Sequence, residues 1–113
     1  MQIRSPASQI KTLQMAIAAA TLAHTPVIVN TRMLIPTSYA DANAINGYVY
    51  EAEFSDAPKA AVAWNALDKL YWDAAAGNVT NVVGANTPIG YALEPNVAGD
   101  AVTGLVAFNA FAS

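Results

Sequence analysis

The clearest pattern in the chain is an alternation between Tyr48 and Phe54, in which apolar residues take every second position. One side of this segment carries the even-numbered residues, which are all apolar, and the other carries Val49, Glu51 and Glu53. Because successive side chains of a strand point to opposite faces, the alternation predicts a strand with one buried face and one solvated face.

Shorter segments of the same kind follow one another along the chain. Positions 11–17 alternate well enough to favour a strand over a helix. Residues 26–29 and 32–35 are apolar runs on either side of Asn30-Thr31, which is typical of a tight hairpin. Further strands are predicted at 70–73, 79–83, 88–93 and 101–111, whereas 37–46 is expected to be a loop and 60–65 a brief helix or an extended edge.

This spacing of short strands predicts an all-β fold. We expect a small single-domain β-sandwich or barrel of about seven to nine short strands, with at most one or two short helical turns. The 113 residues leave room for one domain, since domains commonly contain about 100–150 residues. Within it, residues 1–24 are expected to form an N-terminal arm with the first strand, and residues 25–113 the compact β-domain.

Composition changes the picture at the surface. The chain has 25 alanines, only 12% charged residues and a net charge of −3. Alanine, threonine and asparagine must therefore cover much of the surface, which suits a protein that is itself covered by neighbours better than a free domain. No basic patch is available for phosphate contacts, so nucleic-acid binding is not expected. The apolar stretch 13–23 is too short for a membrane span and weak as an export signal, so we expect neither a membrane partner nor export.

Few residues offer catalytic or ligand-binding chemistry. There is no cysteine, one histidine (His24) and no glycine-rich phosphate loop, so we expect no enzyme activity, no cofactor and no metal site. Glu51 and Glu53 could be imagined as the acid and base of a hydrolase, but neighbouring glutamates on a strand face serve mainly solubility. The aspartates at 68, 73 and 100 lie where turns need a side-chain acceptor, rather than in a dense calcium loop.

The string Asp68-Lys69-Leu70-Tyr71-Trp72-Asp73 is the most specific of several short motifs in the second half of the chain. The others are Pro58-Lys59-Ala60, Trp64, Asn78-Val79-Thr80, Ile89-Gly90 and Gly99-Asp100. Together these motifs resemble the capsid cement, or head decoration, proteins of tailed phages. The resemblance covers about residues 54–108, with a looser match at 25–29. Leu67 stands where members of the family commonly have glycine.

The resemblance implies a compact β-domain that binds the outer surface of the expanded phage head and stabilises contacts between subunits of the major capsid protein. Members usually act as oligomers near the symmetry axes of the capsid, and we expect a homo-oligomer, with a trimer favoured. The implied location is the outer capsid surface of the virion, and the host cytoplasm during assembly.

Two groups of terminal residues are the expected contacts with capsid or sister subunits. They are Gln2, Ile3 and Arg4 in the arm, and Phe108 and Phe111 near the C-terminus. The alternative for the two phenylalanines is that they only close the core.

A different class of function is a carbohydrate-binding or host-attachment module on the virion surface. Trp64, Trp72 and Tyr48 are the side chains that could stack on sugars. Aromatic residues such as Trp64, Tyr71 and Trp72 more often belong to the core.

Overall fold

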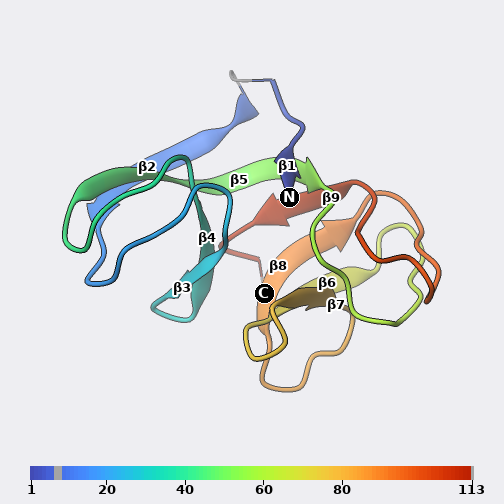
Figure 1. Cartoon of the computed structure of the whole chain (residues 1–113). Coiled ribbons are helices and arrows are strands. Elements are labelled where there is room, and N and C mark those ends of the chain that lie inside the picture. The colour runs from blue at the N-terminus through green and yellow to red at the C-terminus, as the bar shows by residue number, and fades with distance from the viewer. Residues whose placement is uncertain (7–8, 113) are drawn as a thin grey trace.

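A computed structural model describes residues 1–6 and 9–112 and contains strands but no helix in these ranges (Figure 1). The all-β prediction is confirmed: antiparallel strands form one sheet that curls into a half-barrel. The nine strands are β1 (Gln2–Ile3), β2 (Lys11–Ala16), β3 (Val27–Val29), β4 (Arg32–Pro36), β5 (Ile45–Ser55), β6 (Lys69–Asp73), β7 (Asn78–Thr80), β8 (Thr87–Ala92) and β9 (Val106–Asn109).

The long strand β5 organises the sheet because it has partners along both edges. One edge pairs with β2 and then β1, and the other pairs with β4 and then β9. The path continues from β9 through β8 and β6 to β7, while β3 lies beyond β4. β5 changes partner from β4 to β9 partway along its length, so the sheet divides there. The part with β3 and β4 and the part with β6 to β9, which we call the two wings, curl toward each other (Figure 1).

The predicted hairpin is confirmed as β3 and β4. Its two turn residues, Asn30 and Thr31, have φ angles of 50° and 65°. Two positive φ angles in a two-residue loop are typical of a type I′ turn, whose twist matches that of the flanking strands.

Most strand boundaries lie within one residue of prediction, and the differences are largest in β5, β7 and β9. β5 begins at Ile45 rather than Tyr48, β7 ends at Thr80, and β9 occupies only four residues of the range 101–111. The segment 60–65 has no helix and instead crosses the 93–105 loop, where Trp64 bridges Asn96.

The predicted solvated face of β5 is also only partly right. Val49 has an exposed fraction of 2%, and Glu51 and Glu53 are half-buried. The physical reason is that β2 and β4 flank Val49 on its two sides, at Thr12 and Ile35, so neighbouring strands cover positions that a lone strand would expose.

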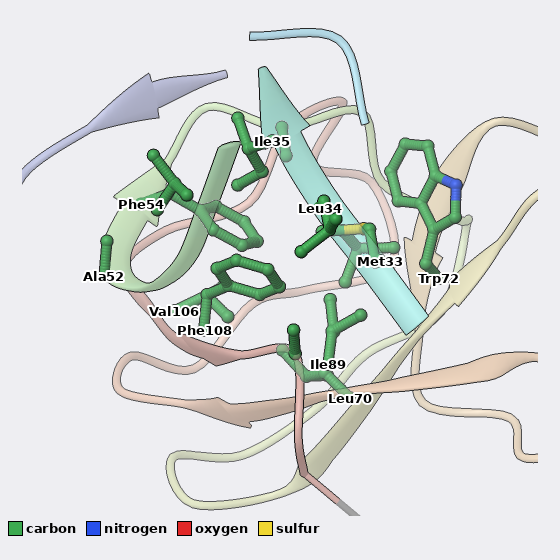
Figure 2. Close-up of a cluster of buried hydrophobic side chains, with 14 of the residues drawn as sticks. Met33, Leu34, Ile35, Ala52, Phe54, Leu70, Trp72, Ile89, Val106 and Phe108 are labelled. Atoms are coloured by element: carbon green, nitrogen blue, oxygen red, sulfur yellow. The ribbon is translucent and has the colours of Figure 1, made fainter. Parts of the chain in front are cut away.

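The core fills the concave side of the half-barrel (Figure 2). Phe54 on β5 and Phe108 on β9 lie with ring centroids 5.9 Å apart. Met33, Leu34 and Ile35 of β4 approach them from the opposite wing. Leu70 and Ile89, from β6 and β8, lie beneath this cluster and are fully buried. The core therefore joins both wings, because each side chain contacts strands distant in the sequence.

Gly90 is required by the close approach of β8 and β9. It pairs with Phe108, has a φ of 133°, and a Cβ placed on it would lie 1.9 Å from the carbonyl oxygen of Ala107. Backbone atoms cannot yield as a side chain can, so no residue with a Cβ fits without separating the strands.

Leu67 occupies a turn whose backbone favours glycine. Its φ is 72°, its side chain is 73% exposed, and the turn is closed by a 3.2 Å hydrogen bond from the Asp68 N–H to the Asn65 carbonyl. This turn leads into β6, where the resemblance placed a glycine in related proteins. The backbone at Leu67 has the left-handed conformation, which is sterically unfavourable for a residue with a Cβ.

We predict that Gly90→Ala destabilises the fold by about 3 kcal/mol or more, through strain and overpacking at the Ala107 carbonyl. Gly99→Ala is the matched control, because nothing lies within 4 Å of the added Cβ and its φ is not in the left-handed region. Urea denaturation measures both. Equal stability of the two variants would contradict the close approach of β8 and β9.

We predict that Leu67→Gly stabilises the protein by about 0.5–1 kcal/mol, because relief of the left-handed strain exceeds the entropy that glycine adds to the unfolded chain. Leu67→Ala removes the same exposed side chain but keeps the strain, and we expect it to leave stability within about 0.5 kcal/mol of the native protein. Thermal melting distinguishes them, and a Gly variant no more stable than the Ala variant would contradict the prediction.

Candidate interaction surface

The N-terminal residues predicted as contacts are bound to the domain. β1 pairs with the end of β5, joining Gln2 to Ser55 and Ile3 to Phe54. The backbone N–H of Arg4 donates to the Glu53 carbonyl at 2.8 Å. The strands of the segment 1–24 are thus part of the same sheet as the rest of the chain.

The Arg4 side chain is engaged within the chain as well. Its Nε donates to Ser55 Oγ at 2.6 Å, and its Nη2 lies 3.0 Å from Asp56 Oδ2. Because half of this side chain is exposed, the ion pair contributes little stability. It nevertheless holds the guanidinium over the end of β5.

The two C-terminal phenylalanines have different environments. Phe108 is 2% exposed and belongs to the core, as the alternative interpretation expected. Phe111 is 56% exposed, with its ring edge-on to Tyr50 at 5.7 Å and the Arg32 guanidinium 4.9 Å from its centroid. Arg32 also donates to the Ala110 carbonyl at 3.0 Å, which fixes the end of β9 to β4. Of these two phenylalanines, only Phe111 is exposed and available for contact with another molecule.

The aromatic motif residues are structural. Trp64, Tyr71 and Trp72 have exposed fractions of 3%, 8% and 7%. Lys59 is buried beside Trp64, with its ammonium 4.8 Å from the ring centroid and a 2.9 Å hydrogen bond to the Ala60 carbonyl. Lys69 Nζ lies 5.7 Å from the ring of Tyr71. The motif therefore builds the β6 region of the core rather than an open aromatic platform.

The three motif aspartates serve turns, as predicted. Asp68 Oδ2 accepts from the Asn65 N–H at 2.8 Å, and Asp73 Oδ1 accepts from two successive backbone N–H groups in the β6–β7 turn. Asp100 accepts from the Asn96 side-chain amide at 2.8 Å and from the Val97 N–H at 3.0 Å. Within the described ranges, no three His, Asp or Glu side chains gather in a way that could hold a metal ion.

The glutamates considered for hydrolysis lie on the outer face of β5. Glu51 pairs with Lys11 Nζ at 3.2 Å and accepts from the Asn109 amide at 3.0 Å. His24 lies in a loop with a φ of 55°, far along the chain from these carboxylates. Glu51 is thus occupied by a structural pair.

Asn96 fixes the 93–105 loop through its hydrogen bonds, although nothing in the sequence singles it out. Its amide nitrogen donates to Asp100, its Oδ1 accepts from the Gly104 N–H at 3.0 Å, and its backbone exchanges two hydrogen bonds with Trp64. Its only signal was the density of turn residues between Glu94 and Asp100, which predicts a loop but not its fixing residue.

Seven of the exposed large apolar side chains belong to the two ends of β5 and to the loops beyond them, while others, such as Val82 and Val83, lie elsewhere. Near the start of β5, the bridge between Thr21 and Ala40 joins two loops. The exposed apolar residues of these loops and the first residue of β5 form a surface that we call the first end: Leu22, Tyr39 and Ile45. Loops beyond the other end of β5 form the second end: Leu67, Leu93, Val97 and Val102. The two ends lie on opposite sides of the molecule (Figure 1).

We predict a pH-dependent contribution of Asp100 to stability. The Asn96 amide and then the Val97 N–H stabilise its carboxylate, lowering the pKa of Asp100 from the ordinary value of 3.8. A lowered folded-state pKa gives stability that is present above the unfolded value and lost as the pH falls through the folded value. Denaturation from neutral pH to below 3.8 should therefore show an acid loss that is smaller in Asp100→Asn. Parallel pH curves for the two proteins would contradict this.

Comparison with known proteins agrees with the motif resemblance. A family model described as phage cement protein matches residues 6–108, a longer range than the motifs alone covered. No curated protein and no solved structure matches the chain. Among the residues that the structure describes, no helix is long and apolar enough to cross a membrane. The family match spans nearly the whole sheet, and the chain belongs to the phage cement protein family.

Proposed function

We propose that this protein binds the outer surface of the expanded phage head and stabilises contacts between neighbouring major capsid protein subunits. The observation that carries the proposal is the match to the cement family across residues 6–108. Its place would be the virion capsid surface after assembly in the host cytoplasm, with neither nucleic acid nor membrane as a partner.

The distribution of exposed side chains supports a bridging role. The first end and the second end carry apolar residues such as Ile45 and Val97, which are 75% and 64% exposed. Apolar area that is buried on binding contributes about 25 cal/mol per Å². A rigid β-domain with an apolar surface at each end can contact two neighbours at once, and this is what a cement requires.

A homo-oligomer, with a trimer favoured, remains part of the proposal. Several weak contacts made by one oligomer raise the effective concentration of the remaining contacts, so overall attachment exceeds the affinity of any single site. This suits a lattice that repeats the same binding surface many times.

No observation favours the carbohydrate-binding alternative. Its stacking candidates Trp64, Trp72 and Tyr48 are 3%, 7% and 1% exposed, so none of the three rings offers a face to a sugar. A hydrolase gains no support either, because Glu51 is held by Lys11 and Asn109. Phage cement proteins are generally not enzymes, and this supports a structural role.

Co-sedimentation with expanded capsids that lack the protein tests the proposal, with light scattering used to measure the solution mass. We expect saturable binding at a fixed ratio to the major capsid protein. Ile45→Asp and Val97→Asp should each weaken binding by about tenfold or more, because each places a charge where binding to the capsid would bury an apolar side chain. Val83→Asp, which lies outside both ends and is 60% exposed in the native protein, is the matched control. Failure of the native protein to bind expanded capsids would refute the proposal.

A further inference from the structure

A groove of about 490 Å³ lies on the outer face of the sheet, opposite the core. Its floor is formed by β9 and β8 at Ala107 and Gly90. We call it the acidic groove, and its polar and aromatic walls are Ser5, Gln9, Glu51, Glu53, Tyr91 and Asn109. It is separate from the apolar first and second ends.

Strand register explains why the surface is hollow here. Glu53 on β5 pairs with Ala107 on β9, Ala107 pairs with Tyr91 on β8, and Tyr91 pairs with Lys69 on β6. Directly paired residues share a face of the sheet, so this row runs from a carboxylate across a methyl group to an aromatic ring. Because the alanine side chain fills little space above the sheet, a depression remains between Glu53 and Tyr91. Tyr91 is 46% exposed and forms one wall.

The two glutamates of the groove differ in their partners. Glu51 is satisfied by Lys11 and Asn109, at 3.2 Å and 3.0 Å. The half-buried carboxylate of Glu53 makes no hydrogen bond or ion pair within ranges 1–6 and 9–112. Covering an unpaired carboxylate is costly unless a cation or donor comes with the covering surface. A surface that covers Glu53 is therefore favoured when it brings a cation or a hydrogen-bond donor to the carboxylate.

Most of the chain's own cations are committed elsewhere. Arg4 pairs with Asp56, Lys11 with Glu51, Arg32 contacts Phe111, and Lys59 is buried against Trp64. The fifth cation, Lys69, lies against Tyr71. The complement of Glu53 is thus best supplied by another protein.

We propose that the acidic groove binds an arginine or lysine side chain from an exposed segment of the capsid surface. The cation would contact the Glu53 carboxylate and lie against the ring of Tyr91, above the small residue Ala107. A cation beside a carboxylate and an aromatic face gains from both interactions as the groove loses water. This inference rests on the proposed function and names a contact that the apolar ends do not supply.

Variants of Glu53 and Asp73 test the groove in capsid co-sedimentation at low and high salt. Glu53→Gln keeps the shape and removes the charge, and its backbone hydrogen bonds to Arg4 and Ser5 do not involve the carboxylate. Asp73→Asn makes the same change in net charge in the β6–β7 turn, outside the groove and both apolar ends, and asparagine keeps an oxygen that can accept from the turn N–H groups. We expect Glu53→Gln to weaken capsid binding by about tenfold or more and to reduce its salt dependence. Asp73→Asn should bind within about twofold of the native protein.

The remaining outcomes separate the two levels of the proposal. Glu53→Lys should reduce binding further than Glu53→Gln, and Tyr91→Ala should weaken it without a change in net charge. If the native protein binds capsids and Glu53→Gln binds equally well, the groove inference is overturned while the proposed function stands. If the native protein does not bind, the proposed function itself fails. If Glu53→Gln instead abolishes self-association in light scattering and leaves capsid binding unchanged, a second copy occupies the groove and the inference is wrong.

Discussion

The pairing of β5 on both edges is the constraint on which the rest of the structure depends. At four positions along this strand a residue has ladder partners on both sides: Tyr48 between Leu13 and Pro36, Val49 between Thr12 and Ile35, Glu51 between Lys11 and Asn109, and Phe54 between Ile3 and Val106. Each pairing joins segments that are far apart in the sequence, so none forms without loop closure. The change of partner from β4 to β9 sets the curl of the sheet and brings Phe54 against Phe108 in the core.

Several of the tight loops at the surface contain locally strained backbone. Among the residues that the structure describes, six other than glycine have positive φ angles. Leu67 and Thr31 are the most strained of them, because their side chains crowd the left-handed backbone. The 93–105 loop is held instead by side-chain hydrogen bonds, those of Asn96 to Asp100 and to the Gly104 N–H. Loops held in this way can expose apolar side chains such as Val97 without unfolding around them, which suits a binding surface that must repeat identically on a lattice.

Charge is scarce in this protein, and most of it is used internally. The five cations contact carboxylates, carbonyls or aromatic rings of the same chain. The aspartates at 68, 73 and 100 accept from turn N–H groups. Apolar contact is therefore the main means of attachment that the surface offers. Glu53 stands out because its carboxylate has no partner among residues 1–6 and 9–112.

Local patterns in the sequence determined the class of fold, the hairpin around Asn30-Thr31, the turn roles of the aspartates and the resemblance to cement proteins, because these depend on residues close together in the chain. Tertiary structure decided which strands are neighbours, and so decided everything that depends on contact between strands. Only the pairing of β8 with β9 shows why Gly90 has no Cβ and why Ala107 leaves a groove. Likewise, Phe108 and Phe111 look equivalent in the sequence, but β9 ends between them, so one is buried in the core and the other is exposed. Periodicity reports the faces of a strand, whereas burial depends on what the rest of the chain places against each face.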